Sequence, residues 1–281
     1  MIEFFRVLGE ADMGFLRMAL GTGLLASIAF GMTGTLVVVK RISYVAGAIA
    51  HAVLGGIGAA LWLQRVHGLD WLHPMYGALA AALIAALLIS GIRGMGMERE
   101  DSVIGAVWAT GMATGLIFLF ETPGYVDPLS YLFGNILIVS GTDFALVAIL
   151  DLILLIVVIS GYSRLQALCF DEEFAKLRGL PTGTGYTLLL CLVACTVVLL
   201  VSLVGVILVV ALLTIPAAMA SPFVRSVAAG MVVSTLLTAL FVTGGLAVSY
   251  GANWPAGPSI ILLAGGAYLL LSLVRRFLLA R

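Results

Sequence analysis

The chain has 281 residues, of which 62% are hydrophobic and 10% are charged, and its formal net charge at pH 7 is zero. A mean hydropathy of +1.20 far exceeds what the core of a soluble protein requires, and it excludes a soluble globular class. The charge balance provides no basic surface for nucleic acid, and three cysteines are too few for a disulfide framework. The composition therefore predicts an all-α polytopic membrane protein with a single transmembrane domain over residues 1–281.

Apolar runs of about 20 residues, the length that crosses a bilayer, recur along the whole chain. The charged residues before the first run do not resemble a removable signal peptide, so we expect the first helix to be retained. About nine spans are predicted, and eight to ten fit the pattern, because residues 185–220 form either one long element or a hairpin around 202–205. The predicted spans are 15–38, 43–63, 75–92, 103–120, 144–161, 185–202, 205–220, 226–248 and 259–275.

The positions of the basic residues distinguish the two alternatives. If 185–220 is a hairpin and the segment 164–182 is cytoplasmic, only Arg6, Arg17 and Arg65 lie outside, as the positive-inside rule requires. The eleven basic residues then inside are Lys40, Arg41, Arg93, Arg99, Arg164, Lys176, Arg178, Arg225, Arg275, Arg276 and Arg281. If residues 185–220 crossed the membrane only once, the C-terminal bases would lie outside unless another helix were lost. The hairpin, nine spans and a cytoplasmic C-terminus are therefore predicted.

Two loops without Lys or Arg are expected on the outer face. The loop 121–143 carries three acidic residues, and the loop 249–257 is uncharged but contains a Tyr and a Trp. Tyr and Trp are enriched at membrane interfaces. We expect both loops to contribute to an outer vestibule.

One compact charged segment, residues 168–181, interrupts the apolar runs. It holds the acids Asp171, Glu172 and Glu173 together with two bases. Such a cluster is unfavourable in lipid, so it must lie at an aqueous face where a partner can reach it. The segment is predicted to be a docking element, and an ordinary solvated loop is the alternative.

Two ionisable residues fall deep within predicted spans. His51 lies about eight residues into the second span, or roughly 12 Å below the inner surface. An imidazole there needs a partner, a water-filled cavity or a metal. Asp151 in the fifth span either pairs with a polar group between helices or lines a substrate path. The chain has no CxxC or HExxH motif, so local spacing gives no preformed zinc site.

The sequence lacks the features of an ATPase or a hydrolase. A P-loop requires Gly-Lys followed by Ser or Thr, but the lysines of this chain, Lys40 and Lys176, follow Val39 and Ala175. No nucleophile and base are suitably arranged on the spans. The chain is therefore predicted not to be an enzyme, and any ATP hydrolysis must come from a partner.

Several segments together resemble a known family. Residues 41–54, 132–137, 170–175 with 179–181, 204–218 and 257–262 are similar, in the same order, to the permease subunits of ABC importers for zinc, manganese and iron, the ABC-3 family. The resemblance covers most of the chain. It implies an inner-membrane permease of bacteria that pairs with a second copy of itself, with cytoplasmic ATP-binding subunits and with an extracytoplasmic metal-binding protein.

The resemblance also implies roles for particular residues. The charged segment looks like a coupling helix that docks on the ATPase, and Glu173, Ala175 and Gly179 match the family's acid, small residue and glycine. The implied ATPase-coupling residues are Asp171, Glu172, Glu173, Phe174, Ala175 and Gly179. ATP and Mg are used by the partner subunit, and this chain binds no cofactor of its own. Its substrate is the transported divalent metal.

His51 matches a metal ligand of the family, but two positions depart from the pattern. Gly47 and Asn253 stand where the family usually has Asp. The loss of a carboxylate one helical turn from His51 is expected to weaken capture of a divalent ion. Asp151 is a candidate to compensate. The sequence thus predicts the permease of an ATP-driven importer for zinc or manganese, with iron also possible; the alternative is a stand-alone secondary transporter or channel for a cation or small solute.

Overall fold

The structure is a computed structural model, and it describes residues 6, 13–94, 100–124, 127–134 and 136–279. Within these ranges the regular structure is helical, and nine helices are long and apolar enough to cross a membrane. The predicted all-α polytopic fold with nine spans is confirmed. Two bases used to predict the orientation, Arg99 and Arg281, lie outside the described residues.

The nine long helices agree closely with the predicted spans. They are α2 (Gly14–Lys40), α3 (Ser43–His67), α4 (Pro74–Gly94), α5 (Glu100–Glu121), α7 (Gly141–Phe170), α9 (Thr182–Val204), α10 (Val206–Ala220), α11 (Val227–Ala252) and α12 (Ala256–Leu279). Four short elements join them: α6 (Pro128–Phe133), the 3-10 turn η2 (Ile136–Ile138), α8 (Glu172–Leu177) and the 3-10 turn η3 (Ser221–Phe223). The fifth span ends at Phe170 and not near residue 161, because a helix satisfies its own backbone and need not stop at the membrane surface.

The predicted outer loops are shorter than expected. In the described part of 121–143, Asp127 caps the N-terminus of α6 by accepting from the Leu129 amide at 3.0 Å. The loop 249–257 is mostly helical, since α11 continues to Ala252 and α12 begins at Ala256. Asn253 ends α11 with φ 54°, a left-handed conformation that Asn tolerates better than most residues. This backbone role accounts for an amide side chain at that position.

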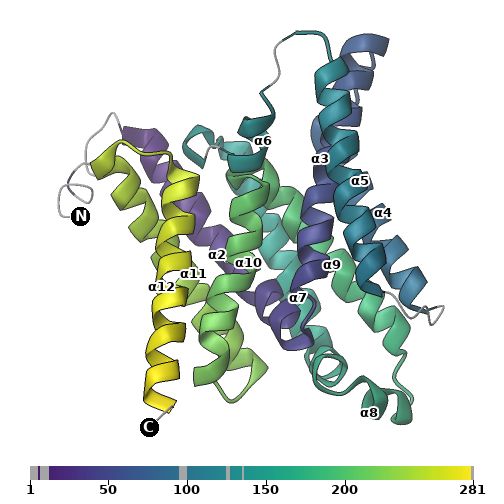
Figure 1. Ribbon diagram of the computed structural model, residues 1–281, viewed down its shortest axis with the longest axis vertical. Helices are drawn as coiled ribbons and strands as arrows, with labels where there is room; N and C mark the ends of the chain where they lie inside the picture. Colours follow the sequence, from purple (N-terminus) through teal and green to yellow (C-terminus); the bar gives the residue numbers. More distant parts are fainter. Residues whose placement is uncertain (1–5, 7–12, 95–99, 125–126, 135, 280–281) are drawn as a thin grey trace.

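The region 185–220 is two helices, as predicted, and not one long element. Gly205 separates α9 from α10 with φ 81°, a conformation that favours glycine. A Cβ at Gly205 would also collide with the backbone of Phe133 and Gly134, which end α6. In Figure 1, α9 and α10 meet beside α6 and then diverge. The turn is therefore fixed both by backbone conformation and by close contact with α6.

The two ends of the helix bundle differ in charge. In Figure 1, α8 and the C-terminal end of α12 lie at one end of the bundle, and α6 and the start of α2 lie at the other. These are called the α8 end and the α6 end below. The last turns of α2, α4 and α12 carry Lys40, Arg93 and Arg276 at the α8 end, whereas the last turn of α3 carries Arg65 at the α6 end. The structure thus gathers at one end bases that are far apart in the sequence.

Helices α2 and α3 form the centre of the bundle. Their most apolar stretches are 72% and 78% buried, compared with 17% for α5 and 22% for α12. The outer helices expose large apolar side chains such as Phe120 and Ile159, as lipid-facing surfaces do. Helix α3 packs between α4 and α5, and α2 packs between α7 and α11.

Candidate functional site

The charged segment forms a short helix at the end of the bundle. Asp171 caps α8 by accepting a hydrogen bond from the Phe174 amide at 2.8 Å. Gly179, with φ 74°, turns the chain after α8 so that α9 can begin at Thr182. Ala175 is 1% exposed, and α8, which carries it, packs against α7 and α9. Of the predicted segment 168–181, residues 168–170 belong to α7 and residues 172–177 form α8.

Glu172 faces the bundle and holds several elements together. Its Oε2 accepts from Lys40 Nζ at 2.8 Å and from Arg93 at 2.7 Å. Lys40 also donates to the Leu168 carbonyl oxygen at 2.8 Å, and the Arg93 guanidinium lies 4.1 Å from the centre of the Tyr186 ring. One carboxylate thus joins α8 to the last turns of α2 and α4, with further contacts to α7 and α9.

The electrostatics of this cluster favour the ionised glutamate. Burial raises the pKa of Glu172, but the Lys40 hydrogen bond and the charges of Arg93, Lys40 and Lys176 together outweigh burial and hold the pKa below its usual value. The side chains of Lys40, Glu172 and Arg93 are 10%, 20% and 30% exposed, so water screens them only in part. Glu172 therefore remains ion-paired with Lys40 and Arg93 at neutral pH.

The opposite face of α8 is open to solvent. Glu173 is exposed, Phe174 is 49% exposed and Leu177 is 88% exposed. Phe170, just before α8, is 65% exposed. Several exposed apolar side chains close together are typical of a surface that another protein covers. The predicted coupling residues thus divide into an inward group and an outward group, a distinction that sequence order does not show.

Sequence reasoning missed the partners of Glu172. Lys40 and Arg93 are 132 and 79 residues away from it in the chain. The signal was present, because both bases fall in the last turn of a span and so share an aqueous face with the acidic segment. Which acid each base meets is decided by the packing of α2 and α4.

His51 lies in the ninth position of α3, half-buried and facing α5. Its Nδ1 is 2.8 Å from the Gly47 carbonyl oxygen. A carbonyl only accepts, so Nδ1 carries the proton, which leaves Nε2 as the nitrogen that can bind a metal. The ring stacks on Trp108 of α5, with 4.3 Å between centroids and 24° between planes. The imidazole is therefore held in one orientation and one tautomer.

Trp108 also explains why residue 47 is small. A Cβ at Gly47 would lie 3.2 Å from the indole ring, which is tighter than normal packing. A side chain at residue 47 would therefore require the Trp108 ring to shift by a few tenths of an ångström. Sequence patterns did not single out Trp108, because an aromatic residue in a membrane helix is usually interpreted as packing.

Asp151 and His51 lie on different helices, α7 and α3. Asp151 is 5% exposed in α7, beside the Ala29 backbone of α2, and neither carboxylate oxygen has a hydrogen-bond partner among the described residues. His51 contacts α5 instead, through the ring of Trp108. The described ranges contain no group of three or more His, Cys, Asp or Glu residues that could hold a metal ion.

The comparisons with known proteins agree with this architecture. The profile of the ABC 3 transport family matches residues 12–275. A probable metal transport system membrane protein of Chlamydia pneumoniae is 42% identical, with 86% of this chain and 83% of the relative covered. The manganese import system permease protein ScaB of Streptococcus gordonii is 30% identical, with 96% and 94% covered. Among solved structures, a chain of PsaBC from Streptococcus pneumoniae in complex with Fab has a TM-score of 0.82 at 32% identity, covering 96% of this chain and 95% of that one.

The nine spans define a multi-pass membrane protein of bacterial transport systems. The chain belongs to the ABC 3 transport family. It is accordingly the permease subunit of an ABC-type metal transporter, as the sequence motifs indicated.

Proposed function

We propose that this chain is the permease of an ATP-driven importer that carries a divalent transition metal into the cell. Manganese is favoured over zinc and iron, because two full-length relatives are named as manganese import permeases. The chain pairs with a second copy of itself, and ATP with Mg is used by cytoplasmic partner subunits. An extracytoplasmic protein delivers the metal to the α6 end.

The observation that carries this proposal is the two-sided arrangement of α8. Its exposed face, with Glu173, Phe174 and Leu177, docks on the ATPase. Its inner face transmits the movement of the ATPase to α2 and α4 through Glu172, because these elements are tied by charge-assisted bonds of 2.7–2.8 Å. The α8 end is therefore cytoplasmic, which also agrees with the bases gathered there.

The metal passes His51 in this proposal. Nε2 of a neutral, oriented imidazole is a good ligand for Mn²⁺ or Zn²⁺, and Trp108 keeps the ring in place. With Gly47 in place of an acid, the site holds the ion weakly, as a conduit requires, since tight binding would slow release. Asp151 is proposed as a second residue of the path.

Transport by the reconstituted complex tests the proposal. Proteoliposomes that hold the chain with its ATPase are loaded with ATP, and uptake of radiolabelled Mn²⁺ and Zn²⁺ is measured with the binding protein outside. We expect uptake that stops with a non-hydrolysable ATP analogue, with Mn²⁺ the better substrate. Uptake that is equal without the ATPase subunit would contradict the importer and support a stand-alone transporter.

A further inference from the structure

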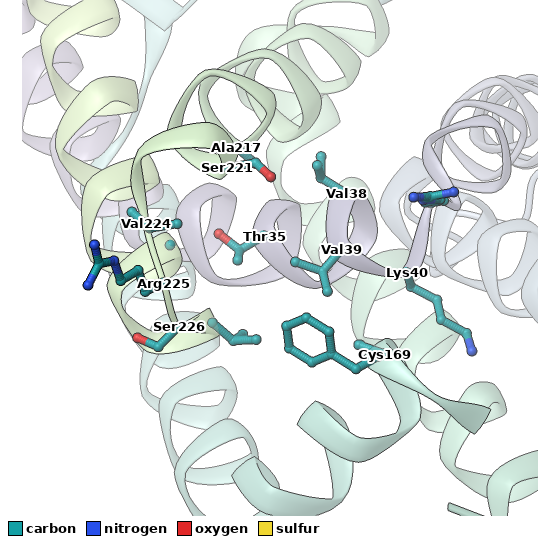
Figure 2. A pocket seen from close by; sticks show the side chains of 14 residues that line it. Thr35, Val38, Val39, Lys40, Cys169, Ala217, Ser221, Val224, Arg225 and Ser226 are labelled. Carbon is teal, nitrogen blue, oxygen red and sulfur yellow. The ribbon is translucent and has the colours of Figure 1, made fainter. Parts of the chain in front are cut away.

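A basic pocket lies at the α8 end, between the ends of α2, α7, α10 and α11 (Figure 2). Its volume is about 630 Å³, in the range of pockets that hold small molecules. Three cationic residues, Lys40, Arg41 and Arg225, are among those that line it, and none of the described residues in its lining is acidic. Figure 2 shows Arg225 and Lys40 on opposite sides, with Thr35 between them. The pocket therefore offers positive charge to its occupant.

The three cations are not equivalent. Lys40 is already bonded to Glu172 and to the Leu168 carbonyl oxygen. Arg41 and Arg225 are exposed, and within the described part of the chain neither forms an ion pair. Guanidinium groups form paired hydrogen bonds with phosphate oxygens. Two such groups beside one cavity, without a competing carboxylate, favour a phosphate ester as the ligand.

An apolar groove lies further along the same helices. It has a volume of about 580 Å³ and runs between α7 and α11 over α2. Apolar side chains dominate its lining, among them Ile28, Met32, Val158, Ile159, Met231 and Val232. Val232 is 60% exposed and Ile159 is 67% exposed, so the groove opens to the lipid side of the bundle. Such a lining suits a hydrocarbon chain.

The pocket and the groove lie along the same three helices, α2, α7 and α11. Met32 in the groove lies three residues before Thr35 in the pocket, so the two share a face of α2. Tyr162 of α7 and Ala228 of α11 both line the groove, and the Tyr162 hydroxyl accepts from the Ala228 amide at 3.1 Å, next to Val227 of the pocket. The seam between α7 and α11 is thus apolar within the membrane and cationic at its end.

We propose that this seam binds one anionic phospholipid, with the phosphate between Arg41 and Arg225 and an acyl chain in the apolar groove. A lipid headgroup and free phosphate share the same anionic chemistry, but only the lipid uses the groove. Basic pockets between membrane helices on the cytoplasmic side are known to hold such headgroups. This site does not depend on the proposed metal path.

Native mass spectrometry of the full chain, titrated with phosphatidylglycerol or phosphatidylcholine, tests the proposal. We expect one phosphatidylglycerol to bind in preference to phosphatidylcholine. Arg225→Gln should weaken that binding roughly fivefold, the effect of one cation near a membrane surface. The matched control is Arg276→Gln, which removes the same charge at the same end of the bundle but outside the pocket, and it should leave the binding unchanged.

A second pair of variants tests the groove. Val232→Trp places a bulky ring in the groove and should lower retention of phosphatidylglycerol. Leu240→Trp, at a site of similar exposure on the same helix but outside the groove, should not. Thermal melting in lipid-free detergent checks that all variants remain folded.

Three results would overturn the proposal. The first is an equal loss of lipid binding in Arg225→Gln and Arg276→Gln. The second is displacement of phosphatidylglycerol by a large excess of inorganic phosphate, which identifies a free-anion site. The third is disulfide cross-linking of two Val232→Cys chains, which shows that a second copy covers the groove.

Discussion

Glu172→Gln removes one negative charge from the point where α8 meets α2 and α4, while the shape of the side chain is kept. In the native protein Oε2 accepts charge-assisted bonds from Lys40 and Arg93 at 2.8 and 2.7 Å. Hydrogen bonds to charged groups contribute about 1.5–3 kcal/mol each, and a neutral amide oxygen keeps roughly half of that. Because these side chains are 10–30% exposed, solvent screening reduces the total. We expect a loss of about 2 kcal/mol in the free energy of unfolding.

The measurement is thermal unfolding of the purified permease in detergent, without its partners. For a chain of this size a loss of about 2 kcal/mol lowers the Tm by roughly 4–8 °C. Glu173→Gln is the matched control, since the neighbouring acid is exposed and its neutralisation should change the stability by less than about 0.5 kcal/mol. If the Tm of Glu172→Gln lies within about 1 °C of the control, the ion pairs of Glu172 do not stabilise the fold as expected.

The same variant gives a pH test. The pKa of Glu172 is lowered in the folded protein from its usual value of 4.5, so folding favours the ionised form. The contribution to stability is therefore complete above pH 4.5 and is lost as the pH falls through the lower folded-state pKa. The difference in stability between native protein and Glu172→Gln should stay constant from pH 7 to about pH 5 and shrink below that. A difference that grows towards acid pH would contradict the assignment.

The remaining predictions concern coupling, the helical turn and the buried acid. Glu173→Lys should abolish ATP-dependent uptake while the protein stays in the membrane with an unchanged Tm; normal uptake would remove Glu173 from the docking surface. Gly205→Ala should lower the Tm, because a backbone with positive φ costs about 1–2 kcal/mol for a residue with a Cβ. The added Cβ would also collide with the end of α6. Gly183→Ala is the control, since a Cβ there meets nothing within 4 Å. Asp151→Asn should reduce metal uptake without loss of folded protein if Asp151 lines the path, and uptake at the native rate would limit it to a structural role.

Hydropathy alone placed the spans well, because length and apolarity decide whether a helix crosses a bilayer. It failed where other forces set the ends of helices. Helix α7 continues to Phe170 beyond its apolar run, and α11 continues to Ala252, where Asn253 stops it with a left-handed backbone. These helix ends depend on capping and tertiary contacts, and a hydropathy average contains no information on either.

The candidate site could be predicted only in part. The density of charged residues indicated α8, and the position deep within a predicted span indicated His51. Both features are unusual in an apolar chain. The partners Lys40 and Arg93 and the stacking of Trp108 on His51 join helices that are distant in sequence. Such pairs depend on how helices pack, which one sequence does not reveal. The inward direction of Glu172 and the outward direction of Glu173 follow from that packing as well.

This permease is proposed to carry a metal past His51. The most direct measurement compares ATP-driven Mn²⁺ uptake by the reconstituted complex for the native chain, His51→Ala and His67→Ala, a control in which an exposed histidine at the α6 end is lost. We expect uptake to be lost in His51→Ala and kept in His67→Ala. Native uptake in His51→Ala, with the protein folded and the ATPase bound, would show that the metal takes another route.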